Sequence, residues 1–188
     1  KAWVDENNSD HHNIYYSVGI PRKTLNRKAA REDIEAVQFL HVDIDPPTGI
    51  DIEIARQQAL SMLENGKDGI PPPTVVINSG GGVQALWRLK ERIEIGGDVA
   101  KAEKAKSHNQ RLEVVFGADN CHNIDRILRL PGTVNWPNAR KRRKGREPRL
   151  ATVEYVKKDR NYDLVRFPAL QTTQSMTSNV DGTDLQLS

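Results

Sequence analysis

The chain has 188 residues and a formal net charge of only +3, and its length suits one domain with its own hydrophobic core. No apolar run approaches the ~18 residues that a membrane span requires, so we expect no membrane partner. The single cysteine, Cys121, cannot form an internal disulfide, which fits a reducing compartment. These features favour a cytoplasmic protein over a membrane-spanning or disulfide-stabilised one.

The spacing of apolar residues predicts the elements in chain order. We expect a strand at 14–18, a strand at 39–45, a helix at 50–65 capped by Thr48, a hairpin of strands 74–78 and 83–89, a helix at 98–116 capped by Asp98, and strands at 124–130 and 150–156. A flexible segment (1–13) should precede the folded domain (14–170), and a polar linker (171–188) should follow it. The order indicates a two-layer α/β (α+β) fold, in which a mostly antiparallel sheet carries helices on one face and leaves the other for substrate.

Paired acids end the strand predicted at 39–45. Asp43 and Asp45 share one face, because strand side chains repeat every second residue, and Pro46 and Pro47 then stop the strand. Two carboxylates this close repel each other unless a cation lies between them. The pattern indicates half of a site for a hard metal ion, with two solvated acids as the alternative.

A third carboxylate would complete such a site. Asp125 lies at the start of a predicted strand, which would deliver it toward Asp43 and Asp45. The alternative is Asp119, at the exit of a predicted helix, where a solvated turn residue is usual, so we favour Asp125. Three carboxylates can hold two divalent ions for in-line phosphoryl displacement, and Mg²⁺ or Mn²⁺ suits their oxygens.

A glycine-rich turn joins the two strands of the predicted hairpin. Backbone N–H groups around Gly80 and Gly81 can form an anion-binding nest, to which Ser79 adds a hydroxyl group, although a plain hairpin turn explains the glycines equally well. Gln84 and Arg88 follow on one face of the returning strand and are suited to phosphate. We therefore predict that this segment binds the phosphates of a nucleotide.

Cations gather in the last part of the chain. Arg126 and Arg129 flank the predicted third carboxylate, and we assign Arg129 to phosphate and Arg126 to neutralising the acids. Residues 140–149 contain seven cations and one acid, which indicates a polyanionic partner or a solvated charged block. The candidates for nucleic-acid binding are Trp136, Arg140, Lys141, Arg142, Arg143 and Lys144.

Three segments, HVDIDPP, INSGGGVQALWRL and IDRILRLPGTVNWPNARKRRKGR, resemble the motifs of the archaeo-eukaryotic primase superfamily. The resemblance extends over residues 14–156, and the closest group is the RepB-like and primase–polymerase domains of plasmids, phages and integrated elements. The first motif is acid–x–acid and the third an apolar residue followed by Asp125. The second motif is Ser-x-His-like and holds nucleotide phosphates. Gln84 stands where many members have histidine, and it carries no charge.

The resemblance implies an RRM-like primase core that joins NTP or dNTP on a single-stranded DNA template. Asp43, Asp45 and Asp125 would hold two Mg²⁺ or Mn²⁺ ions, and a helicase domain or protein is the family's usual companion. The substitution at Gln84 keeps open a non-catalytic replication-initiation or DNA-binding domain of the same fold. A metal-dependent glycosyltransferase is a further alternative, because acid–x–acid strands also bind nucleotide sugars.

Overall fold

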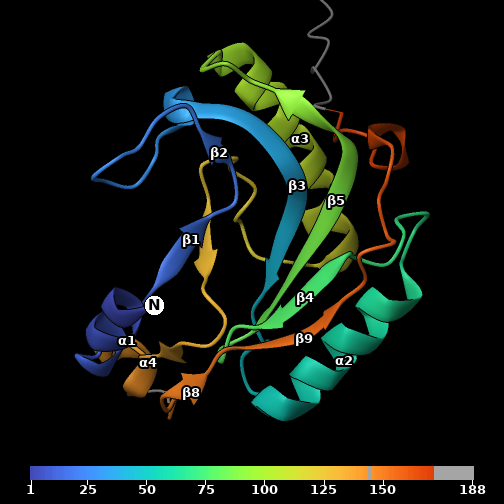
Figure 1. Cartoon of the computed structure of the whole chain (residues 1–188). Helices are drawn as coiled ribbons and strands as arrows, with labels where there is room; N and C mark the ends of the chain where they lie inside the picture. Colours follow the sequence, from blue (N-terminus) through green and yellow to red (C-terminus); the bar gives the residue numbers. More distant parts are fainter. Residues whose placement is uncertain (144, 172–188) are drawn as a thin grey trace, which may run out of the picture.

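A curled antiparallel sheet of five strands forms the centre of the computed structural model, which describes residues 1–143 and 145–171 (Figure 1). Its strands, in spatial order, are β2 (Ile20–Pro21), β3 (Ile34–Ile44), β5 (Val83–Glu94), β4 (Val75–Asn78) and β9 (Thr152–Val156). All of its strand pairs are antiparallel, which confirms the predicted two-layer class. The predicted linker lies, beyond Gln171, outside the described residues.

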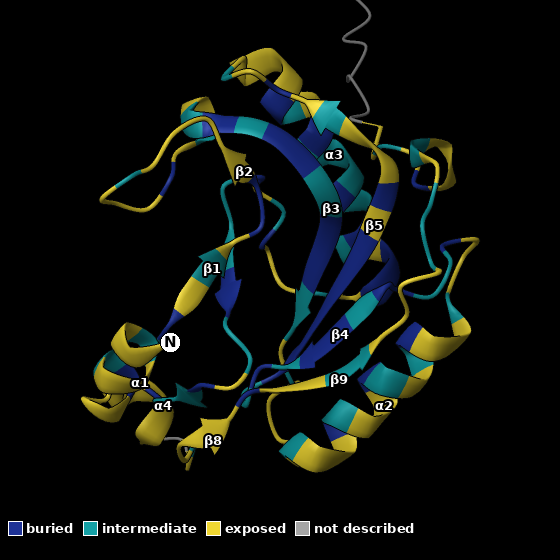
Figure 2. Cartoon of the chain, viewed as in Figure 1, coloured by how far each residue is buried: buried dark blue, intermediate teal, exposed yellow. Residues whose placement is uncertain are grey.

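The helices α2 (Ile52–Asn65) and α3 (Val99–Phe116) pack on one face of this sheet (Figure 1). Between them and the strands lies the main core, in which Leu40 of β3 is opposite Trp87 of β5 and both are fully buried. Figure 2 shows this contrast between buried strands and the exposed outer surfaces of the helices. Within residues 1–143 and 145–171, no helix is long and apolar enough to cross a membrane.

Both helices begin at an aspartate. Asp98 caps α3 as predicted, because its carboxylate accepts hydrogen bonds from the N–H groups of Ala100 and Lys101. The predicted cap of α2, Thr48, is wrong: the helix starts later, and Asp51 accepts the bonds from its first turn. Gly117 ends α3 in the left-handed conformation, which glycine adopts without steric cost.

A second, two-stranded sheet covers part of the other face of the central sheet. It consists of β1 (Tyr15–Ser17) and β6 (Ile127–Arg129), and Figure 1 shows it on the side away from α2 and α3. Leu128 of β6 packs against Ile77 and Leu86 of the central sheet. This face is therefore less available to a substrate than the sequence indicates. The polar part of this face lies where β3 ends and β5 begins, and there Asp43 is opposite Gln84.

The first residues form a helix, α1 (Ala2–Ser9), where we expected a flexible segment or loop. Asn8 explains the difference, because its side chain accepts a hydrogen bond from the N–H of Val134 at 2.7 Å and donates one to the Val134 carbonyl at 2.9 Å. These partners are far away in the sequence, so local periodicity could not reveal them. The remaining elements are β7 (Val134–Asn135), α4 (Ala139–Arg142), β8 (Arg149–Leu150) and the 3₁₀ helices η1 (Arg31–Asp33) and η2 (Leu164–Arg166).

We expect Asn8→Ala to lower the free energy of unfolding by about 1–3 kcal/mol, because it leaves both backbone groups of Val134 without their partner. Denaturant unfolding measures the change. The control is Asn7→Ala, since the Asn7 side chain donates to the Trp3 carbonyl within α1 itself. An equal loss in both variants would contradict the role of Asn8 as the link between α1 and β7.

Candidate active site

Three carboxylates meet at the end of β3. Asp43 is next to the last residue of the strand, and Asp45 follows the strand directly. Asp119 lies beside them, because its N–H donates to the Asp43 carbonyl at 3.0 Å and, after burial, the charge of Asp45 raises the pKa of its carboxyl group. The two acids predicted from the strand pattern are therefore joined by the acid that we considered the less favoured third ligand.

Crowding changes the proton affinity of these acids. Burial raises the pKa of Asp43 to about 6, and the negative charges of Asp45 and Asp119 add to the rise while Arg126 opposes it. The pKa of Asp119 is also raised, first by burial and then by Asp45. Among the described residues, burial and mutual charge thus outweigh the cations at Asp43 and Asp119, a situation that a divalent cation would relieve.

One cation approaches Asp43 from the residue just before β6. Arg126 places Nη2 3.8 Å from Oδ2 of Asp43. Asp125 points to Lys28 instead, with 3.5 Å between Oδ2 and Nζ. The geometry thus favours Asp119 over Asp125 as the third acid, and a metal-binding role for Asp125 stays a prediction.

The donor set suits Mg²⁺ or Mn²⁺, because it consists of hard carboxylate oxygens. In their present positions, however, the acids do not form a metal-binding site. Among the described residues, no three His, Cys, Asp or Glu side chains are grouped so that they could hold a metal ion. Asp45 and Asp119 influence each other through their charges, and Asp43 faces Arg126. Metal binding would require these carboxylates to exchange their present partners for the ion.

The glycine-rich hairpin lies directly against the acids. A Cβ atom at Gly82 would come within 2.4 Å of the Ile44 carbonyl oxygen and 2.8 Å of Oδ1 of Asp45, so only glycine allows this approach. Two N–H groups of the predicted anion nest are already used in hydrogen bonds within the hairpin. Ser79 Oγ accepts a hydrogen bond from the Gly82 N–H at 3.0 Å, and the Gly80 N–H donates to Asn78 at 2.9 Å. Ser79 therefore shapes the hairpin rather than offering a free hydroxyl group.

Arg129 is a buried cation with unused donors. It is only 6% exposed, and its Nη2 donates to Tyr15 Oη at 3.1 Å and to Asn135 Oδ1 at 2.9 Å. Its Nε and Nη1 atoms are buried with no hydrogen-bond partner among the described residues, and the same holds for Oε1 of Gln84. Unpaired buried donors are costly, which is a reason to expect a ligand with acceptor atoms here. Arg88, predicted beside them, is exposed.

Sequence reasoning missed Asn135, which connects two predicted phosphate-binding parts. Its Oδ1 accepts from Arg129, and its Nδ2 donates to the Ser79 carbonyl at 2.8 Å. A short polar residue beside a Pro-Gly turn carries no local signal for such a bridge. Its role follows only from the fold, which places β7 between β6 and the hairpin.

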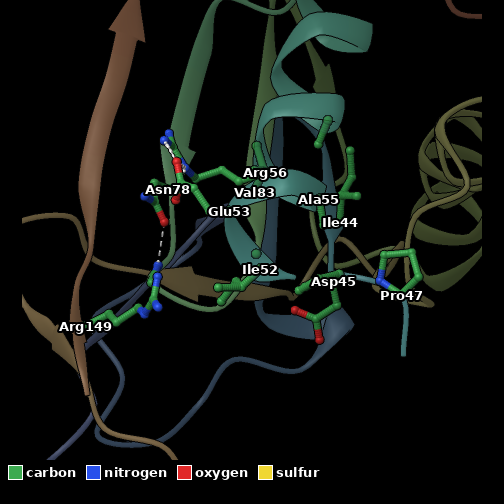
Figure 3. Close-up of a pocket in the computed structure, with 14 residues that line it drawn as sticks. Ile44, Asp45, Pro47, Ile52, Glu53, Ala55, Arg56, Asn78, Val83 and Arg149 are labelled. Carbon is green, nitrogen blue, oxygen red and sulfur yellow. Dashed lines mark hydrogen bonds and ion pairs between the residues drawn. The ribbon is translucent and has the colours of Figure 1, made fainter. Parts of the chain in front are cut away.

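Of the three acids, Asp45 lines two neighbouring hollows. The smaller, of about 40 Å³, lies between the start of α2 and the hairpin, and Figure 3 shows Asp45 and Arg149 on opposite sides of it. The larger, of about 770 Å³, also contains Asp45. Its basic wall consists of Arg140, Lys141, Arg146 and Arg149. An anionic ligand could therefore reach Asp45 along a basic wall.

The predicted nucleic-acid-binding residues divide into two groups. Arg140, Lys141, Arg142 and Arg143 are exposed on or next to α4, whereas Lys144 lies outside the described residues. Trp136 has a structural role that we did not predict. Its Nε1 donates to the Asn8 carbonyl at 2.9 Å, and its ring packs on His11 with 4.1 Å between centroids. Base stacking on this indole is thus limited by contacts with the N-terminal segment.

The curled sheet with helices on one face is similar to the fold of an archaeo-eukaryotic primase (AEP) domain, as a comparison with solved structures shows. Residues 4–174 match the model of the RepB DNA-primase N-terminal domain, and the chain belongs to this family. It is also similar in structure to the AEP domain of the cyanophage S-2L primase-polymerase (PrimPol). The TM-score is 0.61 at 18% sequence identity, over 89% of this chain and 76% of that one.

A comparison with curated proteins found no match. The similarity to the cyanophage domain shows the fold, because its sequence identity is low. Together with the family match, it supports a primase-type function in replication and confirms the resemblance seen in the three motifs. The roles of single residues do not follow from either comparison.

The raised pKa of Asp43 predicts a pH-dependent stability in metal-free buffer. Because the folded state holds the Asp43 proton up to about pH 6 and the unfolded chain releases it near 3.8, stability should fall as the pH rises between these values. The shift corresponds to a loss of roughly 3 kcal/mol at most. Urea unfolding from pH 4 to pH 7 measures it. Asp43→Asn should flatten this decline, and an unchanged decline in the variant would contradict the assignment.

Proposed function

We propose that this domain is the catalytic domain of a primase or primase–polymerase, which joins nucleotides on a single-stranded DNA template. The observation that carries the proposal is the convergence of Asp43, Asp45 and Asp119 at one strand end, in a chain of the RepB primase family. Replication of a plasmid, phage or integrated element, and a helicase as companion, are proposed from the family alone.

Asp43, Asp45 and Asp119 would hold two Mg²⁺ or Mn²⁺ ions. Bound there, such ions would activate the attacking hydroxyl group and neutralise charge on the triphosphate. The chain itself must keep these carboxylates ionised at neutral pH. Arg126 serves this purpose, because its positive charge opposes the rise in the pKa of Asp43.

The triphosphate would bind beside the hairpin. Arg129 offers Nε and Nη1, two buried donors that are free among the described residues, and Asn135 fixes its guanidinium group. Charge-assisted hydrogen bonds from arginine to phosphate are strong and directional. Gln84 lies opposite Asp43 and can donate its amide N–H without adding charge, so Arg129 would supply the positive charge that a histidine at this position could contribute.

The basic wall of the larger hollow would guide the template. Arg140 and Lys141 line the same hollow as Asp45, and the positive charge of Lys141 opposes the rise in the pKa of Asp119. Contacts of this kind bind the backbone of a single strand without reading its sequence. The proposed template path therefore ends at the three carboxylates.

The third acid can be identified by a primer-synthesis assay on single-stranded DNA with Mn²⁺. We expect Asp119→Asn to lower the rate about 100-fold, equivalent to about 3 kcal/mol of lost charge stabilisation. Asp125→Asn should have a much smaller effect, because Asp125 is paired with Lys28. Each substitution removes one charge at constant size, so the two variants are matched controls. The reverse order of effects would restore Asp125 as the third ligand.

A non-catalytic DNA-binding domain is the second candidate. It is favoured by the lack of a finished three-ligand group among the described residues and by the uncharged Gln84. The same assay separates the two candidates. If the wild type forms product and the double variant Asp43→Ala, Asp45→Ala does not, the binding-only function is excluded. Template binding without product in the wild type would support it.

The template-binding role of α4 predicts a change in salt dependence. Removing two exposed cations, Arg140→Ala with Arg143→Ala, should make the slope of log K against log salt for single-stranded DNA less steep by about 1.4, if each contacts one phosphate. The control pair, Lys157→Ala with Lys158→Ala, changes two exposed lysines beyond the far end of β9. Fluorescence anisotropy at several salt concentrations measures the slope. Equal slopes for both pairs would contradict the proposed path.

A further inference from the structure

A buried polar network connects α3 to the edge of β3. Strand β2 pairs with β3 only around Ile34 and Ala36, so farther along β3 its outer backbone groups need other partners. Asn109 of α3 supplies one, because its Oδ1 accepts from the His41 N–H at 3.1 Å. Asn109 is fully buried, and its Nδ2 also donates to the His122 carbonyl at 3.1 Å. One side chain thus connects the strand to the segment after α3.

His41 adds a second connection between the same two parts. Its Nε2 lies 3.0 Å from the Cys121 carbonyl, which can only accept, so Nε2 carries the proton. Its Nδ1 is then an acceptor, and Asn109 Nδ2 donates to it at 3.3 Å. All side-chain polar atoms of His41 and Asn109 therefore have partners with consistent donor and acceptor roles.

Glu113 holds the same segment from one helical turn farther along α3. Its Oε1 accepts from the Cys121 N–H, and its Oε2 lies 2.7 Å from Nδ1 of His122. Residues four apart on a helix lie on one face, so Asn109 and Glu113 act on the segment together. The backbone of Cys121 and His122 is thereby fixed at three points.

This fixed backbone lies two residues after Asp119. At its other end the segment begins at Gly117, the C-cap of α3. Between these two anchors, the Asp119 N–H donates to the Asp43 carbonyl, which places Asp119 beside β3. The position of the Asp119 carboxylate is thus set by the anchors on either side of it.

We propose that Asn109, His41 and Glu113 form a clamp that positions Asp119 as the third acid of the site. The proposal rests on the function proposed above, in which Asp119 is a metal ligand. An apolar contact could also cover the edge of β3, but it would not orient the segment. A fully paired polar network in the interior specifies one arrangement, because any shift leaves buried groups unpaired. These three are positioning residues, which act through Asp119.

The test is the affinity for Mn²⁺, measured by calorimetry on the whole chain. Asn109→Leu should weaken binding about 10-fold, as expected when a group that orients a ligand is lost. In an Asp119→Asn background the same substitution should have no further effect, because the clamp then has no ligand to position. Glu113→Gln, which keeps the side-chain size and leaves one acceptor oxygen, should weaken binding in the same direction by a smaller factor. It is the fallback if Asn109→Leu folds poorly.

The control is Val115→Ala, because Val115 is buried on the same helix but makes none of these side-chain hydrogen bonds. It should destabilise the fold without changing the Mn²⁺ affinity. Amide hydrogen exchange gives a readout without metal: Asn109→Leu should speed exchange at Asp119 and Cys121 while Leu40 stays protected. Unchanged exchange, or equal Mn²⁺ effects with and without Asp119, would overturn the clamp. If the Asp43→Asn variant binds Mn²⁺ as tightly as the wild type, the proposed function fails. The exchange data then still decide whether the clamp holds the segment.

Discussion

Repulsion among Asp43, Asp45 and Asp119 is the constraint on which the arrangement of the site depends. Burial first, and then the charges of Asp45 and Asp119, raise the pKa of Asp43, and a fold selected for stability alone would not gather these charges. The surrounding elements keep the acids together nonetheless. Strand β3 carries two of them, the segment after α3 supplies the third, and the hairpin approaches closely through Gly82.

The cations around the acids do not neutralise them completely. Arg126 is 3.8 Å from Asp43, too far for a close ion pair with good hydrogen bonds, and its buried Nε has no partner in the described part of the chain. Nε and Nη1 of Arg129 also have no hydrogen-bond partner among residues 1–143 and 145–171. Crowded acids and unused donors at the same end of the sheet are complementary to a ligand that is both anionic and metal-bound. A nucleoside triphosphate with divalent ions has this chemistry.

Local signals in the sequence were sufficient for the elements that carry the acid pair. The alternation around Asp43 and Asp45 gave the strand, and Asp98 and Gly117 gave the limits of α3, because each of these features acts within a few residues. The helix α1 could not be predicted in this way. Its key residue, Asn8, is polar and finds its partners at Val134, so its sequence has the polar character of a loop.

The third acid shows most clearly where local reasoning ends. Asp125 was favoured because it precedes a strand, but β6 pairs with β1 in a separate sheet and Asp125 lies 3.5 Å from Lys28, so its nearness to a strand does not by itself place it beside Asp43. Asp119 follows a helix, which is usual for solvated residues, yet the segment that contains it bonds to the open edge of β3. Adjacency to a strand locates a side chain only when the sheet to which the strand belongs is known. That knowledge comes from long-range pairing, and here from the polar side chains of α3 that hold the segment in place.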